Sequence, residues 1–127
     1  MNTYQIATTF VALDDSCGAH PLPVTPDFWE ALPSGRLGEF SRMVSSYTFA
    51  SDWTTWERHP GGEEFVCLLN GDVDFVLEKG DGEVVVTLNQ PGTYVLVPAN
   101  TWHTARVRRA TTMLFITPGA GTENRPV

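Results

Sequence analysis

The chain has 127 residues, of which 42% are hydrophobic and 18% charged, and its formal net charge is −7. A chain of this length forms one domain and can bury a core without disulfide staples. Its acidic excess argues against binding to nucleic-acid phosphates or to an anionic membrane surface, because both need clustered positive charge. We therefore expect neither a nucleic-acid nor a membrane partner.

The N-terminal segment, residues 1–39, differs in pattern from the rest of the chain. It is predicted to supply one strand within its first 13 residues, then a turn-rich, irregular stretch, and then a short helix. Thr25 is a suitable N-cap for that helix, Pro26 suits its first position, and Pro33 and Gly35 are expected to end it. Because no Lys or Arg lies in the first 11 residues, a secretory signal is not expected, and we predict a cytoplasmic protein.

Residues 40–117 read as strands and turns. Thr, Val and Ile are abundant there, and Gly or Pro recurs at short, regular intervals. A first stretch can form one bent strand or two short ones, and the later predicted strands cover 64–69, 73–78, 83–88, 93–97, 102–107 and 111–117. Such spacing indicates an antiparallel sandwich or barrel. Residues 118–127 are predicted to be an irregular tail, so that the whole chain forms a single all-β domain with a short N-terminal helix.

Two of the three histidines, His59 and His103, lie at the ends of predicted strands. Side chains alternate along a strand, so Glu57 and His59 are expected on one face, and Glu64 begins the next strand. If these faces line a barrel, two imidazoles and two carboxylates converge near its mouth. His20, in an irregular stretch, is predicted to be an ordinary surface residue.

These residues resemble the first motif of the cupin superfamily, which reads Gly, five residues, His, one residue, His, three or four residues, Glu, six residues, Gly. Here Glu57 takes the place of the first His, followed by His59, Glu64 and Gly71 at the required spacing. Ser51 stands where the motif opens with Gly.

The second motif of that superfamily is Gly, five residues, Pro, one residue, Gly, two residues, His, three residues, Asn. The chain matches it with Gly92, Pro98 and His103, while Asn100 replaces the second Gly and Val107 the closing Asn. The whole chain also looks like small bacterial single-domain cupins of the conserved-barrel type. The resemblance therefore implies a jelly-roll barrel, the double-stranded β-helix of cupins.

By this resemblance, the metal ligands would be His59, Glu64 and His103, together with Glu57. Such a set suits one divalent ion, Fe, Mn, Zn or Ni, with an open position for water or substrate. Two carboxylates close together in an apolar barrel repel each other unless a cation or a proton lies between them. The alternative is a metal-free barrel in which the two histidines are hydrogen-bonded mouth residues.

Two functions fit these residues. The first is a metal-dependent enzyme, possible classes being dioxygenase and isomerase, that acts on a small organic molecule. The second is a sensor or storage barrel that binds a small ligand without turnover.

A homodimer is also expected. Phe65, Cys67 and Leu69 lie opposite in parity to Val66 and Leu68, so that both faces of one strand are apolar. A strand of this kind needs a cover outside the barrel, which a second copy or the N-terminal segment can supply.

Overall fold

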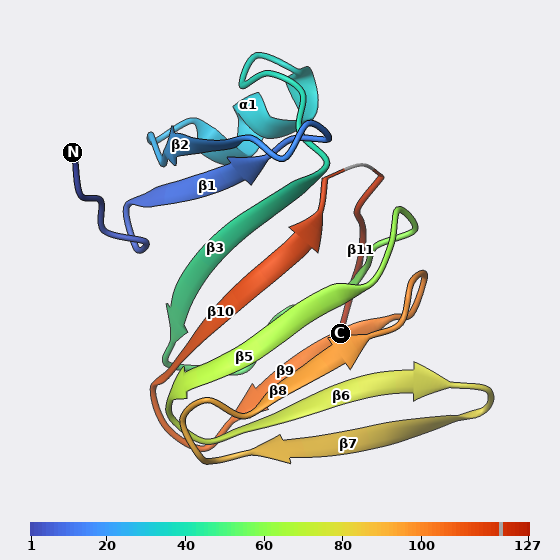
Figure 1. Cartoon of the computed structure of the whole chain (residues 1–127). Coiled ribbons are helices and arrows are strands. Elements are labelled where there is room, and N and C mark those ends of the chain that lie inside the picture. Colours follow the sequence, from blue (N-terminus) through green and yellow to red (C-terminus); the bar gives the residue numbers. More distant parts are fainter. Residues whose placement is uncertain (120) are drawn as a thin grey trace.

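Two antiparallel sheets face each other in the structure, a computed structural model that describes residues 1–119 and 121–127 (Figure 1). The six-stranded sheet has the order β2-β1-β3-β10-β5-β8, and the five-stranded sheet has the order β11-β4-β9-β6-β7. The strands are β1 Thr9–Leu13, β2 Ala19–Pro23, β3 Arg42–Phe49, β4 Thr55–Arg58, β5 Glu64–Asn70, β6 Val73–Lys79, β7 Gly82–Leu88, β8 Tyr94–Val97, β9 His103–Val107, β10 Thr111–Pro118 and β11 Glu123–Pro126.

The all-β prediction is confirmed. Each of the six strands predicted between residues 64 and 117 is present as β5 to β10, with ends displaced by one residue at most. The preceding stretch forms two strands, β3 and β4. This agreement has a simple cause, because alternating inward and outward residues between Gly and Pro turns leave few other registers open.

Strand β2 was not expected, since residues 14–24 were predicted to be irregular. It pairs antiparallel with β1, from Thr9 opposite Pro23 to Leu13 opposite Ala19. Two of its five residues are prolines, which a strand at the edge of a sheet tolerates because one side of its backbone needs no ladder hydrogen bonds. Pairing with β1 therefore overrides the turn-rich local composition.

The helix α1 spans Phe28–Ser34, after two strands and not at the start of the chain. Its N-cap is Asp27 and not the predicted Thr25, and the helix continues through Pro33 to end at Gly35, which has a left-handed backbone. No helix among the described residues has the length and apolar character needed to cross a membrane.

The predicted irregular tail also needs correction, because it contains strand β11. That strand pairs antiparallel with β4, with Asn124 opposite Glu57 and Glu123 opposite Arg58. A strand of four polar or proline residues has no alternating apolar pattern, so the sequence could not predict it. Ala120 lies outside the described residues.

The inner faces of the two sheets share one apolar core. Buried residues from both sheets form it: Val66, Leu68, Val73, Phe75, Leu77, Leu88, Val97, Ala105, Met113 and Phe115. A second cluster joins α1 to β1 and β3, where the Phe10 and Phe28 rings meet edge to face at 5.4 Å beside Met43. Figure 1 shows α1, β1 and β2 at one end of the molecule and the β6–β7 hairpin at the other.

Gly71 closes the first motif for a steric reason. It has φ 133°, and a Cβ placed there would lie 2.6 Å from the Thr111 Cα and 2.4 Å from its Oγ1. A residue with a side chain can neither adopt this φ without strain nor approach the neighbouring backbone so closely. Gly80 also has a positive φ, 56°, but nothing lies within 4 Å of the position that a Cβ would take there.

We therefore predict that Gly71→Ala lowers the free energy of unfolding by more than about 2 kcal/mol, because it adds a clash to an unfavourable backbone conformation. Gly80→Ala should cost only about 1 kcal/mol, the cost of a left-handed backbone. Denaturant unfolding of both variants measures the difference. Equal losses would show that the close approach to Thr111 relaxes freely.

Candidate metal centre

The four predicted site residues come together from both sheets. Glu57 lies on β4 with His59 just after it, and His103 opens β9 directly opposite Glu57 in the register. Glu64 opens β5, which belongs to the other sheet. The site therefore joins the two sheets at one end of the core, where three strand ends meet.

Within this group, three side chains face one another at short range. The Glu64 Oε1 lies 3.2 Å from the His103 Nε2, and the Glu64 Oε2 lies 3.3 Å from the His59 Nε2. The Glu57 Oε2 is 3.7 Å from the same His59 nitrogen. Yet His59 Nε2, His103 Nε2 and Glu64 Oε1 are buried without an aligned hydrogen-bond partner among the described residues. Such orphaned polar atoms are costly in an apolar interior.

These distances fit a metal ion. Ligand atoms about 2.1 Å from a tetrahedral ion lie about 3.4 Å from one another, close to the measured contacts. Glu57, His59 and His103 each offer one ligand atom, all within 4.8 Å of one another. Glu64 contacts both imidazoles but lies outside that group of three. The two carboxylates thus approach the imidazole pair differently, and the residues present can hold a divalent cation.

Burial differs sharply within the site. The side chains of His103, Glu64 and His59 are 0%, 3% and 4% exposed, whereas that of Glu57 is 33% exposed. Solvent therefore reaches the group from the side of Glu57. Trp53 and Tyr47 pack against the core, with the Trp53 ring centroid 6.4 Å from that of His103.

The turn before His103 explains why Asn100 can replace the motif's glycine. Asn100 has φ 58°, a left-handed conformation that Asn adopts more readily than other residues with side chains. In this conformation its backbone N–H donates to the His59 carbonyl oxygen at 3.0 Å. The two histidine-bearing segments are thereby tied together by their backbones.

Three threonines that the sequence analysis did not single out contact the site. The Thr117 hydroxyl donates to the Glu64 Oε2 at 2.7 Å, and the His103 Nδ1–H donates to the Thr101 carbonyl at 2.9 Å. The His59 Nδ1 and the Thr122 Oγ1 are 2.9 Å apart. Thr117 was detectable in principle, because it continues the inward alternation of Met113 and Phe115 on β10. The Thr101 carbonyl and Thr122, in the predicted irregular tail, follow no such sequence pattern.

The charges in the group perturb one another. Burial raises the pKa of Glu57, and the neighbouring Glu64 raises it further. Burial also acts to raise the pKa of Glu64, but contacts with His103 and His59 outweigh it and hold that pKa at about 2. For His103, burial lowers the pKa, yet Glu64 more than compensates and the net change is upward. Without an ion, the site is thus organised around a charged Glu64 that both imidazoles face.

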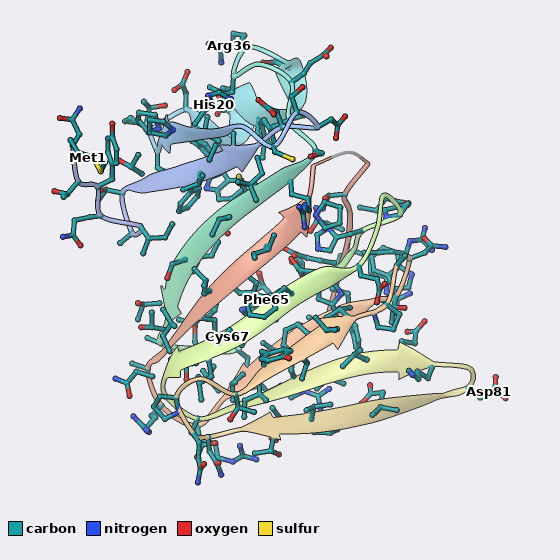
Figure 2. The ribbon with its side chains drawn as sticks, in the orientation of Figure 1. Met1, His20, Arg36, Phe65, Cys67 and Asp81 are labelled. Carbon is teal, nitrogen blue, oxygen red and sulfur yellow. The ribbon has the colours of Figure 1, made fainter. Side chains whose placement is uncertain are left out.

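Other polar residues stay apart from this group. His20 is exposed and pairs with Asp14 at 2.7 Å, and Figure 2 shows it in the N-terminal part of the molecule, far from Asp81 at the tip of the β6–β7 hairpin. Two surface hollows lie beside Asp14, Asp15 and Ser41, and none of the four site residues lines either of them.

Comparison with known proteins identifies the fold. No family model and no curated protein matches the sequence. Among solved structures, the chain is similar to a cupin superfamily protein from Desulfitobacterium hafniense, with 21% identity, a TM-score of 0.53, and coverage of 64% of this chain and 70% of that one. The chain has a cupin fold. The resemblance seen in the two motifs is thereby confirmed at the level of architecture.

Two enzymes share this cupin fold. Hydroquinone 1,2-dioxygenase from a Sphingomonas strain, solved with 4-hydroxybenzoate bound, is 19% identical over 65% of this chain and 63% of that one, with a TM-score of 0.53. Hydroxypropylphosphonic acid epoxidase from S. wedmorenis is 14% identical over 61% of this chain and 43% of that one, also with a TM-score of 0.53. At these identities the likeness concerns the fold alone.

The shifted pKa values predict how the stability of the metal-free protein depends on pH. The contribution of Glu64, whose pKa falls from 4.5 to about 2, is complete above 4.5 and is lost as the pH falls through about 2. The contribution of His103, whose pKa is raised, is complete below 6.5 and is lost as the pH rises through its raised pKa.

Both contributions are complete between pH 4.5 and pH 6.5. In EDTA, the free energy of unfolding of wild type should therefore exceed that of Glu64→Gln by roughly 3 kcal/mol in this range, and by less at lower or higher pH. Thermal unfolding over a pH series measures this difference. Glu63→Gln, at an exposed neighbour, should follow wild type throughout. A gap that does not change with pH would contradict the ion pair.

Proposed function

We propose that Glu57, His59, Glu64 and His103 hold one divalent metal ion, and that the barrel binds or converts a small organic molecule there. The observation that supports this is the trio of buried, unpartnered atoms, His59 Nε2, His103 Nε2 and Glu64 Oε1. One cation beside them would accept both nitrogen lone pairs and contact the carboxylate as well. Imidazole and carboxylate ligands suit Fe(II), Mn(II), Zn(II) or Ni(II).

The ion, when bound, would act as a Lewis acid that polarises an oxygen of the small molecule. The chain's own residues then divide their roles by burial. His59, His103 and Glu64 are enclosed and held by threonines, whereas Glu57 is part-exposed on the side that solvent reaches. Glu57 therefore lies where an entering molecule arrives, and its raised pKa would favour proton transfer whenever it is not a ligand.

An enzyme of dioxygenase or isomerase type is the leading form of this proposal. It is supported by the fold that the chain shares with a hydroquinone dioxygenase. The chain shares it as well with a further solved structure, that of an Fe(II) protein called HppE with an alternative substrate. The alternative is a non-catalytic ligand-binding or sensor barrel without metal, which the charge pairing of Glu64 with His103 supports. Metal analysis separates the two, and oxygen uptake with small phenols and organic acids then tests the dioxygenase form.

We predict that purified wild type binds one divalent ion per chain and that His59→Ala or His103→Ala abolishes stoichiometric binding while the barrel stays folded. Each histidine supplies a donor that no neighbour replaces. Glu57→Gln should weaken binding less, because that side chain is part-exposed and farthest from the imidazole it contacts. Elemental analysis and metal-induced thermal shift measure these effects.

His20→Ala is the matched control, because His20 is exposed, pairs with Asp14 and lies on β2, which carries none of the site residues. It should keep the wild-type metal content and thermal shift. Equal metal content in wild type and His103→Ala would overturn the proposed site and favour the metal-free alternative.

A homodimer completes the proposal. The outer face of β5 and β8 carries Phe65, Cys67, Leu69, Tyr94 and Leu96, with no charged side chain, and Figure 2 labels Phe65 and Cys67 along β5. Leu69, Tyr94 and Leu96 are 40%, 56% and 58% exposed. A second copy offers the same uncharged face, so that two-fold pairing would bury both at once and cover the edge strand β8.

We predict a dimer at micromolar concentration and a monomer for Leu96→Asp, which places a charge on this face. Val85→Asp is the control, because Val85 is 51% exposed but lies on β7 in the other sheet. Light scattering distinguishes the species. A wild-type monomer of 14.0 kDa would remove the dimer from the proposal.

A further inference from the structure

We infer that Thr122 is a positioning residue for His59, and that strand β11 is the element that brings it there. Thr122 immediately precedes β11, and its Oγ1 lies 2.9 Å from the His59 Nδ1. Neither cupin motif includes it. Its effect on metal affinity rests on the proposed function, whereas its effect on the His59 ring does not.

The two histidines have different partners at Nδ1. His103 faces the Thr101 carbonyl, which only accepts, so the Nδ1 of His103 keeps its proton and its Nε2 is available to an ion. His59 faces a hydroxyl, which can accept or donate. With an ion bound, the His59 Nδ1–H would donate to Thr122. Without one, the Thr122 hydroxyl could donate to Nδ1 while the His59 Nε2 carries the proton toward Glu64. The His59 ring therefore keeps one orientation in both states.

Strand β11 is firmly held where Thr122 needs it. It pairs with β4 along its whole length, and Glu123 accepts from the Arg58 guanidinium at 2.8 Å. Arg125 pairs with Glu78 and lies over the rings of Trp102 and Trp56, at 4.5 and 5.4 Å from their centroids. The Arg58 guanidinium lies over the Trp102 ring as well, at 4.6 Å.

The residues in this outer stack are sequence neighbours of the site residues. Trp56 and Arg58 flank Glu57, Arg58 precedes His59, and Trp102 precedes His103. Because successive strand residues point to opposite faces, the stack holds from outside the same backbone that presents the ligands inside. The β11 segment thus supports His59 in two ways. Its strand pairs with β4, which ends one residue before His59, and Thr122, one residue before β11, contacts the His59 ring.

The test compares Thr122→Val, which removes the hydroxyl and keeps the shape, with Thr122→Ser, which keeps the hydroxyl. Two quantities are measured: Zn(II) affinity by calorimetry, and the imidazole ¹⁵N signals of the metal-free protein. The chain has three histidines, so these signals are few. Thr48→Val is the control, since it removes an exposed hydroxyl that pairs with Thr112 at 2.8 Å, outside the site.

Thr122→Val should move the Nδ1 signal of His59, leave that of His103 in place, and weaken Zn(II) binding about tenfold or more, the usual effect of removing a hydrogen bond to a ligand. Thr122→Ser and Thr48→Val should match wild type in both. An unchanged His59 signal in folded Thr122→Val would overturn the inference, whatever the Zn(II) result. Failure of wild type to bind Zn(II) or the other candidate ions would instead count against the proposed function, and the ¹⁵N comparison would still decide the role of Thr122.

Discussion

A charged carboxylate inside an apolar barrel is the constraint on which this structure depends. Glu64 is 3% exposed, and burial alone would favour its neutral form. Its charge is tolerable only because His59, His103 and the Thr117 hydroxyl converge on it from three other segments. Because those segments must all reach Glu64, the packing of the two sheets and the assembly of the site depend on each other.

The alternation of strand residues connects the site to the outer surface. The face of β4 and β9 that turns inward carries Glu57 and His103, while the residues just before them, Trp56 and Trp102, stack with arginines outside. A carboxylate that faces an imidazole inside and a tryptophan that meets a guanidinium outside thus stand one residue apart. This arrangement holds the backbone of the site by contacts on both sides, which would suit the proposed metal centre because ligands must keep a fixed geometry.

The fold restricts the chemistry less than the side chains do. Cupin barrels with the same architecture belong to a dioxygenase and to an epoxidase, so architecture alone selects no reaction. What distinguishes this chain is Glu57 at the place of a histidine, part-exposed where the group meets solvent. In the proposed metal site, a second carboxylate would lower the net charge and add a group able to exchange protons with a bound molecule.

Sequence alone predicted six of the strands, β5 to β10, and motif spacing singled out the four residues that converge between the sheets, because period-two alternation and fixed motif spacing are local properties that a single register satisfies. It missed β2 and β11, whose residues have little strand propensity and form strands only because β1 and β4 offer them an edge. It also missed Thr122, since nothing near this residue in the chain refers to His59. Only the tertiary structure decided which nitrogen of each imidazole faces the centre, because that choice depends on partners supplied by segments remote in the chain or by a backbone carbonyl whose direction the turn sets.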